Sequence, residues 1–388
     1  MNIIFSYLIQ ISIILTPILS LPILSRVLDT DEFNLYLLLQ SLCVWISYVI
    51  DYGFIITATK LIKENKKSVS NIIYSKLLLS LLSLIIYVIL SFIINVDSIL
   101  IFLSSIYMVL MGMNFYWYFI AVEKLKNKSI IEFISSSFFI LILLFFLNYS
   151  TIDINELFCL LIVSRAINIF ASIYCIYKDG CNFEFNLLVV IDTLRYSFDA
   201  FILKSGATLY TVANGYIISL VLGVNSSALY LQSERIIKSA FSSLVPPLTN
   251  AIYPKVIRGD VKVRIIEFFV LFLSLLLSIF LYIFRDYILS FFYHSYSYDL
   301  LLAYEIFIFI IPIISMTNVM MFTRVYKYDL EKKVSKIILI AGLINIIVLP
   351  VMTYSFNEVG AIISCIFIEF VILISIYVIT KNKVESDR

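Results

Sequence analysis

The chain has 388 residues, of which 62% are hydrophobic and only 14% are charged, and its mean hydropathy is +1.03. This composition excludes a water-soluble globular protein, because a soluble fold needs a polar surface to cover its core. The formal net charge of +2 gives no support for nucleic-acid binding, since the basic residues are spread over many separate helix ends. Lipid is therefore the expected solvent.

Long apolar runs, separated by short polar breaks, recur along the whole chain. A helix needs about 20 mostly apolar residues to cross the hydrocarbon core of a bilayer. By that criterion we expect twelve membrane-spanning helices, at residues 3–24, 35–59, 71–95, 99–122, 129–148, 155–177, 197–222, 227–253, 264–284, 300–325, 334–356 and 358–379. The predicted fold class is an all-α integral membrane protein with twelve transmembrane helices.

The basic residues of the breaks are distributed unevenly along the chain. If the N-terminus is cytoplasmic, 22 Lys and Arg residues lie at the inward-facing ends of the helices, against only Arg26 and Arg285 at the outer ends. Cytoplasmic loops of membrane proteins carry such an excess of basic residues. The pattern predicts a multi-pass protein with both termini in the cytoplasm.

The longest cytoplasmic break divides the twelve helices into six and six. We therefore expect an N-terminal lobe at 1–177, a cytoplasmic linker at 178–196 and a C-terminal lobe at 197–388. An offset of 194 residues places SRVLDTDEFNLYL (25–37) over SLVLGVNSSALYL (219–231), with six of thirteen positions identical. Both segments follow the first helix of a lobe, which indicates a parallel repeat and a pseudo-two-fold axis, as in many transporters. Chance similarity in a chain rich in Leu, Ile and Ser is the alternative.

Four basic residues remain inside the predicted helices: Arg165, Lys204, Arg235 and Lys238. Each costs roughly 2.5–3.5 kcal/mol at a helix centre, so such residues face protein or water rather than lipid. Arg235 and Lys238 share one helix face, and Lys204 begins a polar face on the preceding helix. We expect a cationic, substrate-binding cavity between the lobes, which suits a phosphate or another anion.

Acidic residues in the same helices leave an alternative open. Glu234 precedes Lys238 by four residues and Asp199 precedes Lys204 by five, so internal ion pairs could neutralise both cations. Glu369 lies near the middle of the last predicted helix, where a carboxyl group is either a proton or cation site or a paired structural residue. Asp199, Glu234 and Glu369 are therefore candidates for ion coupling or gating.

Motifs for catalysis or cofactor binding do not occur. We find no phosphate-binding glycine loop, no nucleophile elbow and no zinc-binding helix motif. The five cysteines have no metal-ligand spacing. We expect no cofactor, no metal site and no enzymatic activity.

Two segments near the N-terminus carry a resemblance to a known family. LPILSRVLDTDEFNLY (21–36) contains Arg26, and DYGFIITATK (51–60) begins with Asp51, Tyr52 and Gly53. Both segments resemble the O-antigen and polysaccharide flippases of the multidrug/oligosaccharidyl-lipid/polysaccharide exporter superfamily.

Two further segments extend the resemblance. NFYWYFIAVEKLK (114–126) agrees with the family at Trp117 but has Ile120 and Ala121 where the family has Gln and Gly. The segment 230–256, YLQSERIIKSAFSSLVPPLTNAIYPKV, is similar to the eighth helix of the family. Agreement at the level of motifs covers about a fifth of the chain.

The resemblance implies a MATE-like fold, a location in the bacterial inner membrane, and a substrate. That substrate would be an oligosaccharide linked to undecaprenyl pyrophosphate, carried from the cytoplasmic to the periplasmic face by alternating access. A polysaccharide polymerase and a chain-length regulator are the implied protein partners, besides the lipid bilayer. A multidrug exporter of the same superfamily and a membrane glycosyltransferase or polymerase are the alternatives.

Overall fold

The computed structural model describes residues 16–64, 68–149, 152–181, 185–257 and 263–386, and these residues contain helices and no strands. They divide into two compact units, unit 1 (Met1–Thr208) and unit 2 (Leu209–Arg388), which we describe separately. Eight of the described helices are long and apolar enough to cross a membrane, and a ninth is counted if the bent helix pair at 204–222 forms one span. The expected all-α membrane class is confirmed, whereas twelve crossing helices are not reached by this count.

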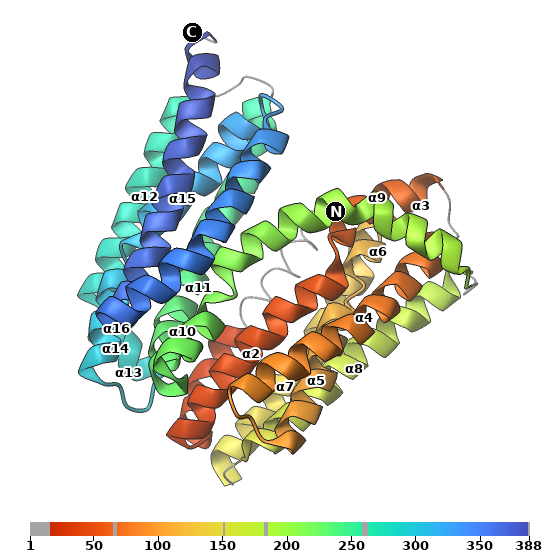
Figure 1. Ribbon diagram of the computed structural model, residues 1–388, viewed down its shortest axis with the longest axis horizontal. Helices are drawn as coiled ribbons and strands as arrows, with labels where there is room; N and C mark the ends of the chain where they lie inside the picture. Colours follow the sequence, from red (N-terminus) through yellow and green to blue (C-terminus); the bar gives the residue numbers. More distant parts are fainter. Residues whose placement is uncertain (1–15, 65–67, 150–151, 182–184, 258–262, 387–388) are drawn as a thin grey trace. The chain divides into compact units, whose positions relative to one another are not determined.

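Unit 1 begins, in its described part, with a helix at Thr16–Val27. The helices that follow are α2 (Thr30–Asp51), α3 (Phe54–Glu64), α4 (Ser68–Ile93), α5 (Ser98–Gly112), α6 (Tyr116–Ala121), α7 (Leu125–Tyr149), α8 (Ile154–Lys178) and α9 (Leu187–Thr211). Helices α2, α4, α5, α7 and α8 lie alongside one another, and α9 lies next to α3 (Figure 1). Helix α4 exposes Leu81 and Ile85 on its outer face, as expected where lipid is the solvent.

Unit 2 contains α10 (Asn214–Leu222), α11 (Val224–Ile257), α12 (Val263–Ile283), α13 (Arg285–Phe292), α14 (Tyr298–Phe307), α15 (Ile310–Met320), the π-helix η1 (Met321–Val325) and α16 (Glu331–Ser386). Helices α11 and α16 contact each other and both α14 and α15, and α12 packs on α11 and α15 (Figure 1). Helix α16 covers two expected spans, and the non-helical dihedrals of Phe356 and Asn357 separate its two parts.

Small residues let neighbouring helices approach closely, as they do in many membrane proteins. A Cβ atom built on Gly112 of α5 would lie 2.6 Å from the Cβ of Ile50 in α2. In unit 2 a Cβ atom on Gly215 of α10 would lie 2.6 Å from a methyl carbon of Leu231 in α11. Because apolar side chains gain little by leaving lipid, such close backbone packing contributes much of the association between these helices.

The start of α9 differs from the expectation of a linker at 178–196. Helix α9 begins at Leu187, because the side-chain oxygen of Asn186 accepts hydrogen bonds from the backbone N–H groups of Leu188 and Val189, at 3.1 and 3.5 Å. The sequence reading assigned 197–208 to the second lobe, whereas the compact units divide between Thr208 and Leu209.

The repeat inferred from the sequence agrees with the helix boundaries. Helix α2 begins at Thr30 and α11 at Val224, so the two starts are separated by 224 − 30 = 194 residues. The residue before each helix is Asp29 in one case and Gly223 in the other, and only Gly223 has a positive φ, of 86°. The two aligned segments therefore contain helix starts at matching positions.

Candidate functional site

The turn between α2 and α3 holds the DYG sequence singled out above. Tyr52 and Gly53 both have left-handed backbone conformations, with φ of 48° and 73°. A Cβ atom on Gly53 would lie 2.8 Å from the carbonyl carbon of Ala200 in α9, so glycine permits this close approach. One residue further along α9, the ring of Phe201 stacks on that of Tyr52 with centroids 4.5 Å apart. The turn is thus the place where α9 packs against the end of α2 and the start of α3.

The Asp51 carboxylate, at the end of α2, joins three helices. It accepts hydrogen bonds from the ammonium groups of Lys204 in α9 and of Lys76 in α4, the latter at 3.4 Å. Lys76 is 0% exposed, and its ammonium also donates to the backbone carbonyls of Gly112 and Asn114, each at 3.0 Å. The buried ammonium of Lys76 therefore has three hydrogen-bond acceptors, and one of them, the Asp51 carboxylate, also supplies the opposite charge.

A second buried cluster joins α7 and α8. The Glu132 carboxylate lies 3.2 Å from the Lys128 ammonium and 3.3 Å from a guanidinium nitrogen of Arg165. Asn168 connects the groups further, because its amide donates to Glu132 at 2.9 Å and its oxygen accepts from Lys128 at 2.6 Å. The cluster is a closed network in which every charged member has a partner.

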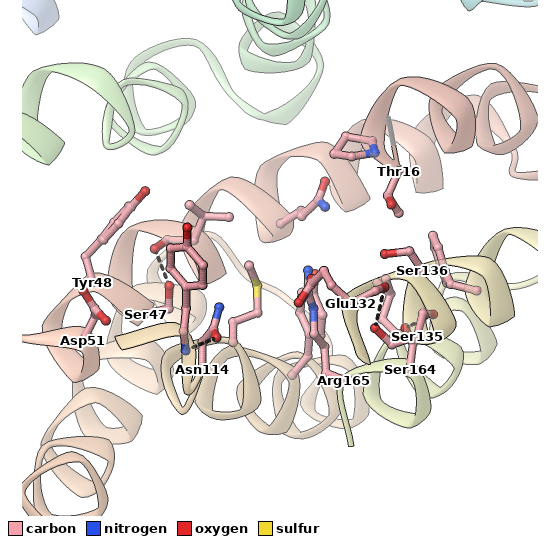
Figure 2. A pocket seen from close by; sticks show the side chains of 18 of the residues that line it. Thr16, Ser47, Tyr48, Asp51, Asn114, Glu132, Ser135, Ser136, Ser164 and Arg165 are labelled. Carbon is pink, nitrogen blue, oxygen red and sulfur yellow. Dashed lines mark hydrogen bonds and ion pairs between the residues drawn. The ribbon is translucent and has the colours of Figure 1, made fainter. Parts of the chain in front are cut away.

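Between these two clusters lies a cavity of about 320 Å³, which we call the unit 1 cavity. Figure 2 shows Tyr48 and Asp51 at one end, Ser135, Ser136 and Ser164 at the other, and Glu132 with Arg165 between them. The other lining residues are Thr16, Pro17, Ser20, Tyr36, Gln40, Val44, Ser47, Ile55, Tyr107, Met111, Asn114, Tyr116, Trp117, Phe139, Leu161 and Lys204. The volume is at the lower end of the roughly 300–1,000 Å³ found for small-molecule sites.

Unit 2 has its own polar network, centred on Glu234 and Lys238 of α11. The Lys238 ammonium donates to the Glu234 carboxylate at 2.6 Å and to the backbone carbonyl of Thr211 at 2.7 Å. The Tyr230 hydroxyl donates to the same carboxylate at 2.9 Å. Thr211 is the last residue of α9, so Lys238 satisfies a carbonyl that the helix end leaves without an intrahelical donor.

Asn214, at the start of α10, extends this network to α16. Its side-chain amide donates to the Tyr210 carbonyl, the Tyr230 hydroxyl and the Cys365 sulfur, at 2.8, 3.1 and 3.1 Å. Its side-chain oxygen accepts a hydrogen bond from Asn345 at 2.8 Å. The helix axis bends by 41° between Thr211 and Asn214, and these hydrogen bonds stabilise the bend.

The structure places the four expected cations in two groups. Arg165 and Lys204 line the unit 1 cavity, whereas Arg235 and Lys238 lie in unit 2. The ion pair of Lys238 with Glu234, one of the alternatives left open, is present. The other alternative is wrong, because the ammonium of Lys204 pairs with Asp51, which comes from a distant part of the chain.

The remaining candidates are placed as follows. Asp199 is exposed and directly precedes Ala200 and Phe201, the residues of α9 that contact the DYG turn. Glu369 lies half-buried in the second part of α16 and interacts electrostatically with Lys238. The exposed guanidinium of Arg26 donates to the carbonyl of Pro22, near the end of its own helix.

Lys128 and Arg324, two of the 22 basic residues expected at cytoplasmic helix ends, are buried. Lys128 is 1% exposed within the Glu132 cluster, and Arg324 is 5% exposed. The guanidinium of Arg324 donates from two nitrogens to the two oxygens of Glu267, each at 2.6 Å. The sequence could have predicted the ion pair of Lys128 with Glu132, because these residues are four positions apart in one helix. It gave no indication of the pair between Arg324 and Glu267, which lie on different helices.

Comparison with known proteins gives the family. A family model described as polysaccharide biosynthesis protein matches residues 1–259. A candidate O-antigen transporter of Escherichia coli (strain K12) is 25% identical over 98% of this chain and 96% of its own length. A protein of Shigella dysenteriae with the same description is 23% identical over 96% of this chain and 98% of its own length.

Solved structures show the same fold. The lipid II flippase MurJ in an inward closed conformation aligns with a TM-score of 0.74 and 14% identity, over 98% of this chain and 87% of that chain. A multidrug resistance MATE family transporter of the MOP superfamily, in an outward-facing conformation, aligns with a TM-score of 0.59 and 12% identity, over 99% of this chain and 95% of that chain. The expected resemblance and the MATE-like fold class are confirmed, and the relatives are transporters rather than enzymes. Since the family model covers more than half of the sequence, the chain belongs to the polysaccharide biosynthesis protein family.

Proposed function

We propose that the chain is a flippase for a lipid-linked oligosaccharide, with undecaprenyl pyrophosphate as the lipid carrier. The observation that carries the proposal is the unit 1 cavity, a polar space lined by hydroxyl, amide and charged groups inside an apolar helical unit. A glycan needs such a polar environment to leave the aqueous phase, whereas its lipid tail can stay in the bilayer. The two O-antigen transporter relatives support the same substrate class.

Alternating access is the proposed mechanism, and the equivalent starts of α2 and α11 support it. Transporters built from parallel repeats expose a central site to each side of the membrane in turn. We place the protein in the bacterial inner membrane with both termini in the cytoplasm, on the basis of the 22 inward-facing basic residues. A reporter fused after Val190 should be active in the cytoplasm, and periplasmic activity would contradict this orientation.

The basic residues Arg165, Lys204, Arg235 and Lys238 are proposed to attract the pyrophosphate or acidic sugars. Arg165, Lys204 and Lys238 form ion pairs with Glu132, Asp51 and Glu234, respectively. Those ion pairs lower the positive charge that the three present to a ligand. Arg235 carries a guanidinium, whose planar fork suits a phosphate, and the test therefore addresses this residue.

Asp199, Glu234 and Glu369 remain the proposed residues for coupling to a proton or sodium gradient. Glu369 interacts electrostatically with Lys238, so a proton or cation bound at Glu369 would change the charge balance of the network around Asn214. A polysaccharide polymerase and a chain-length regulator are the proposed partners, since they would act on the flipped product.

The function is tested by complementation of a deletion strain, with surface polysaccharide as the readout. Arg235→Ala should abolish surface polysaccharide while the protein accumulates in the membrane at wild-type level. Arg235→Lys should restore it only in part, because lysine keeps the charge but lacks the planar fork that binds phosphate through two hydrogen bonds. Ser239→Ala, on the same helix, is the matched control and should be unaffected.

Wild-type polysaccharide in Arg235→Ala would reject the role of Arg235, and failure of the wild-type gene to complement would reject the flippase itself. The drug-exporter alternative predicts instead that deletion raises sensitivity to cationic drugs with no loss of polysaccharide.

A further inference from the structure

We propose that the unit 1 cavity is a carbohydrate subsite, which takes a sugar ring of the glycan. Of the four basic residues proposed above to attract the pyrophosphate, this leaves Arg235 and Lys238, which lie in unit 2. This inference rests on the proposed flippase function. It deepens that function by assigning one part of the substrate to one set of residues. Four features of the cavity carry it: its aromatic rings, its hydroxyl groups, two buried polar atoms without partners, and its charge balance.

Aromatic rings and hydroxyl groups dominate the lining. The aromatic residues are Tyr36, Tyr48, Tyr107, Tyr116, Trp117 and Phe139, and the hydroxyl-bearing aliphatic residues are Thr16, Ser20, Ser47, Ser135, Ser136 and Ser164. A sugar ring has apolar C–H faces, which suit aromatic side chains, and a rim of hydroxyl groups, which need hydrogen-bond partners. The lining offers both kinds of contact in one space.

The serine hydroxyls are oriented to accept hydrogen bonds. Ser20, Ser47 and Ser164 donate their protons to the backbone carbonyls of Pro17, Val44 and Ser135. A hydroxyl that donates in this way keeps lone pairs for an incoming donor. Sugar hydroxyls are such donors, whereas a fully ionised pyrophosphate has none.

Two buried polar atoms of the lining lack partners within the described part of the chain. The indole N–H of Trp117 has no acceptor, and Trp117 is only 1% exposed. The side-chain oxygen of Gln40 in α2 has no donor. Buried groups of this kind are costly unless something satisfies them. A ligand rich in hydroxyl groups can accept from one and donate to the other.

The charges of the lining balance. Asp51 and Glu132 contribute two negative charges, and Lys204 and Arg165 contribute two positive charges, in ion pairs. Two buried lysines lie behind these carboxylates. Lys76, 0% exposed, is held by Asp51 and backbone carbonyls. Lys128, 1% exposed, is held by Glu132 and Asn168. A pyrophosphate would have to separate these ion pairs to be neutralised, whereas a neutral sugar would not.

Tryptophan fluorescence gives a direct test, because the chain has only two tryptophans. Trp45 is absent from the lining, so the variant Trp45→Phe leaves Trp117 as the single reporter. The full-length variant, purified in detergent micelles, is titrated with the oligosaccharide released by mild acid from the lipid-linked precursor of the host. We expect a saturable change in Trp117 emission, and no change with inorganic pyrophosphate. A response to pyrophosphate alone, or to neither probe, would overturn the subsite.

Calorimetry on variants identifies the contacts. Trp117→Phe keeps an aromatic ring but removes the N–H donor, so it should weaken oligosaccharide binding roughly fivefold, the scale of one hydrogen bond. Gln40→Met, of similar shape, should weaken binding to a comparable extent. If gel filtration and thermal melting show that Trp117→Phe does not fold, the affinity of Gln40→Met tests the subsite in its place. Trp45→Phe should bind like the wild type. Wild-type affinity in a folded Trp117→Phe protein and in Gln40→Met would overturn the assignment.

The complementation assay separates this inference from the proposed function. If the oligosaccharide does not bind but the gene restores surface polysaccharide, the subsite is wrong and the flippase stands. If the gene does not restore polysaccharide, the flippase is wrong whatever the cavity binds.

Discussion

Replacing Gly53 by alanine tests whether the DYG turn permits the close packing of α9 against the turn between α2 and α3. Gly53 has a φ of 73°, and a Cβ atom there would lie 2.8 Å from the carbonyl carbon of Ala200 and 2.9 Å from its Cβ. Both neighbours are fixed parts of a helix, so neither can move aside without shifting α9. We expect Gly53→Ala to weaken the stacking of Tyr52 on Phe201 and the ion pair between Asp51 and Lys204.

Two costs add in this variant. A left-handed conformation costs an L-residue about 1–2 kcal/mol, and overpacking of a fixed interface costs roughly 1–3 kcal/mol more. Gly180→Ala is the matched control, since Gly180 has a φ of 77° but nothing within 4 Å of its would-be Cβ. The control carries only the conformational cost, so the difference between the variants isolates the contact with α9.

Thermal unfolding of the purified protein measures this difference. For a unit of about 200 residues, each kcal/mol lowers the melting temperature by about 2–4 °C, so Gly53→Ala should melt roughly 2–12 °C below Gly180→Ala. Equal melting temperatures for the two variants would show that α9 does not contact Gly53 as described, and would refute the reasoning.

Two further substitutions test the charged networks. Arg324→Lys should lower the free energy of unfolding by roughly 1–3 kcal/mol in denaturation experiments, because lysine cannot reproduce the two hydrogen bonds to Glu267. An unchanged free energy of unfolding would show that this pair of hydrogen bonds does not stabilise the protein. Asp179 lies outside the membrane-spanning segments, and although burial raises its pKa, hydrogen bonds from Lys124 and Tyr118 outweigh burial and hold the pKa below the ordinary 3.8. Its carboxylate therefore stabilises the fold fully above that ordinary value, and the effect is lost as pH falls through the lowered pKa. Asp179→Asn should lower the melting temperature at neutral pH and not at strongly acidic pH, and an equal loss at both would refute this origin.

The sequence by itself predicted the class of the protein and most of its helices. Apolar runs report burial in lipid directly, so α4, α7, α8 and α12 lie where the composition placed them. The 194-residue offset was also visible in the sequence, because the two aligned segments contain the starts of α2 and α11. The DYG sequence pointed to a special turn, although its reason, the close approach of Ala200, was not visible.

Tertiary structure decided which charges meet. Sequence spacing finds partners only within one helix, which is why the pair of Glu234 and Lys238 was foreseen and the pair of Asp51 and Lys204 was not. Partners on different helices are brought together by packing, and packing depends on helix rotation and on close contacts such as the one at Gly53. A basic residue near a helix end looks the same in sequence whether it faces water or, like Arg324, a carboxylate on a neighbouring helix, because only the fold supplies that carboxylate.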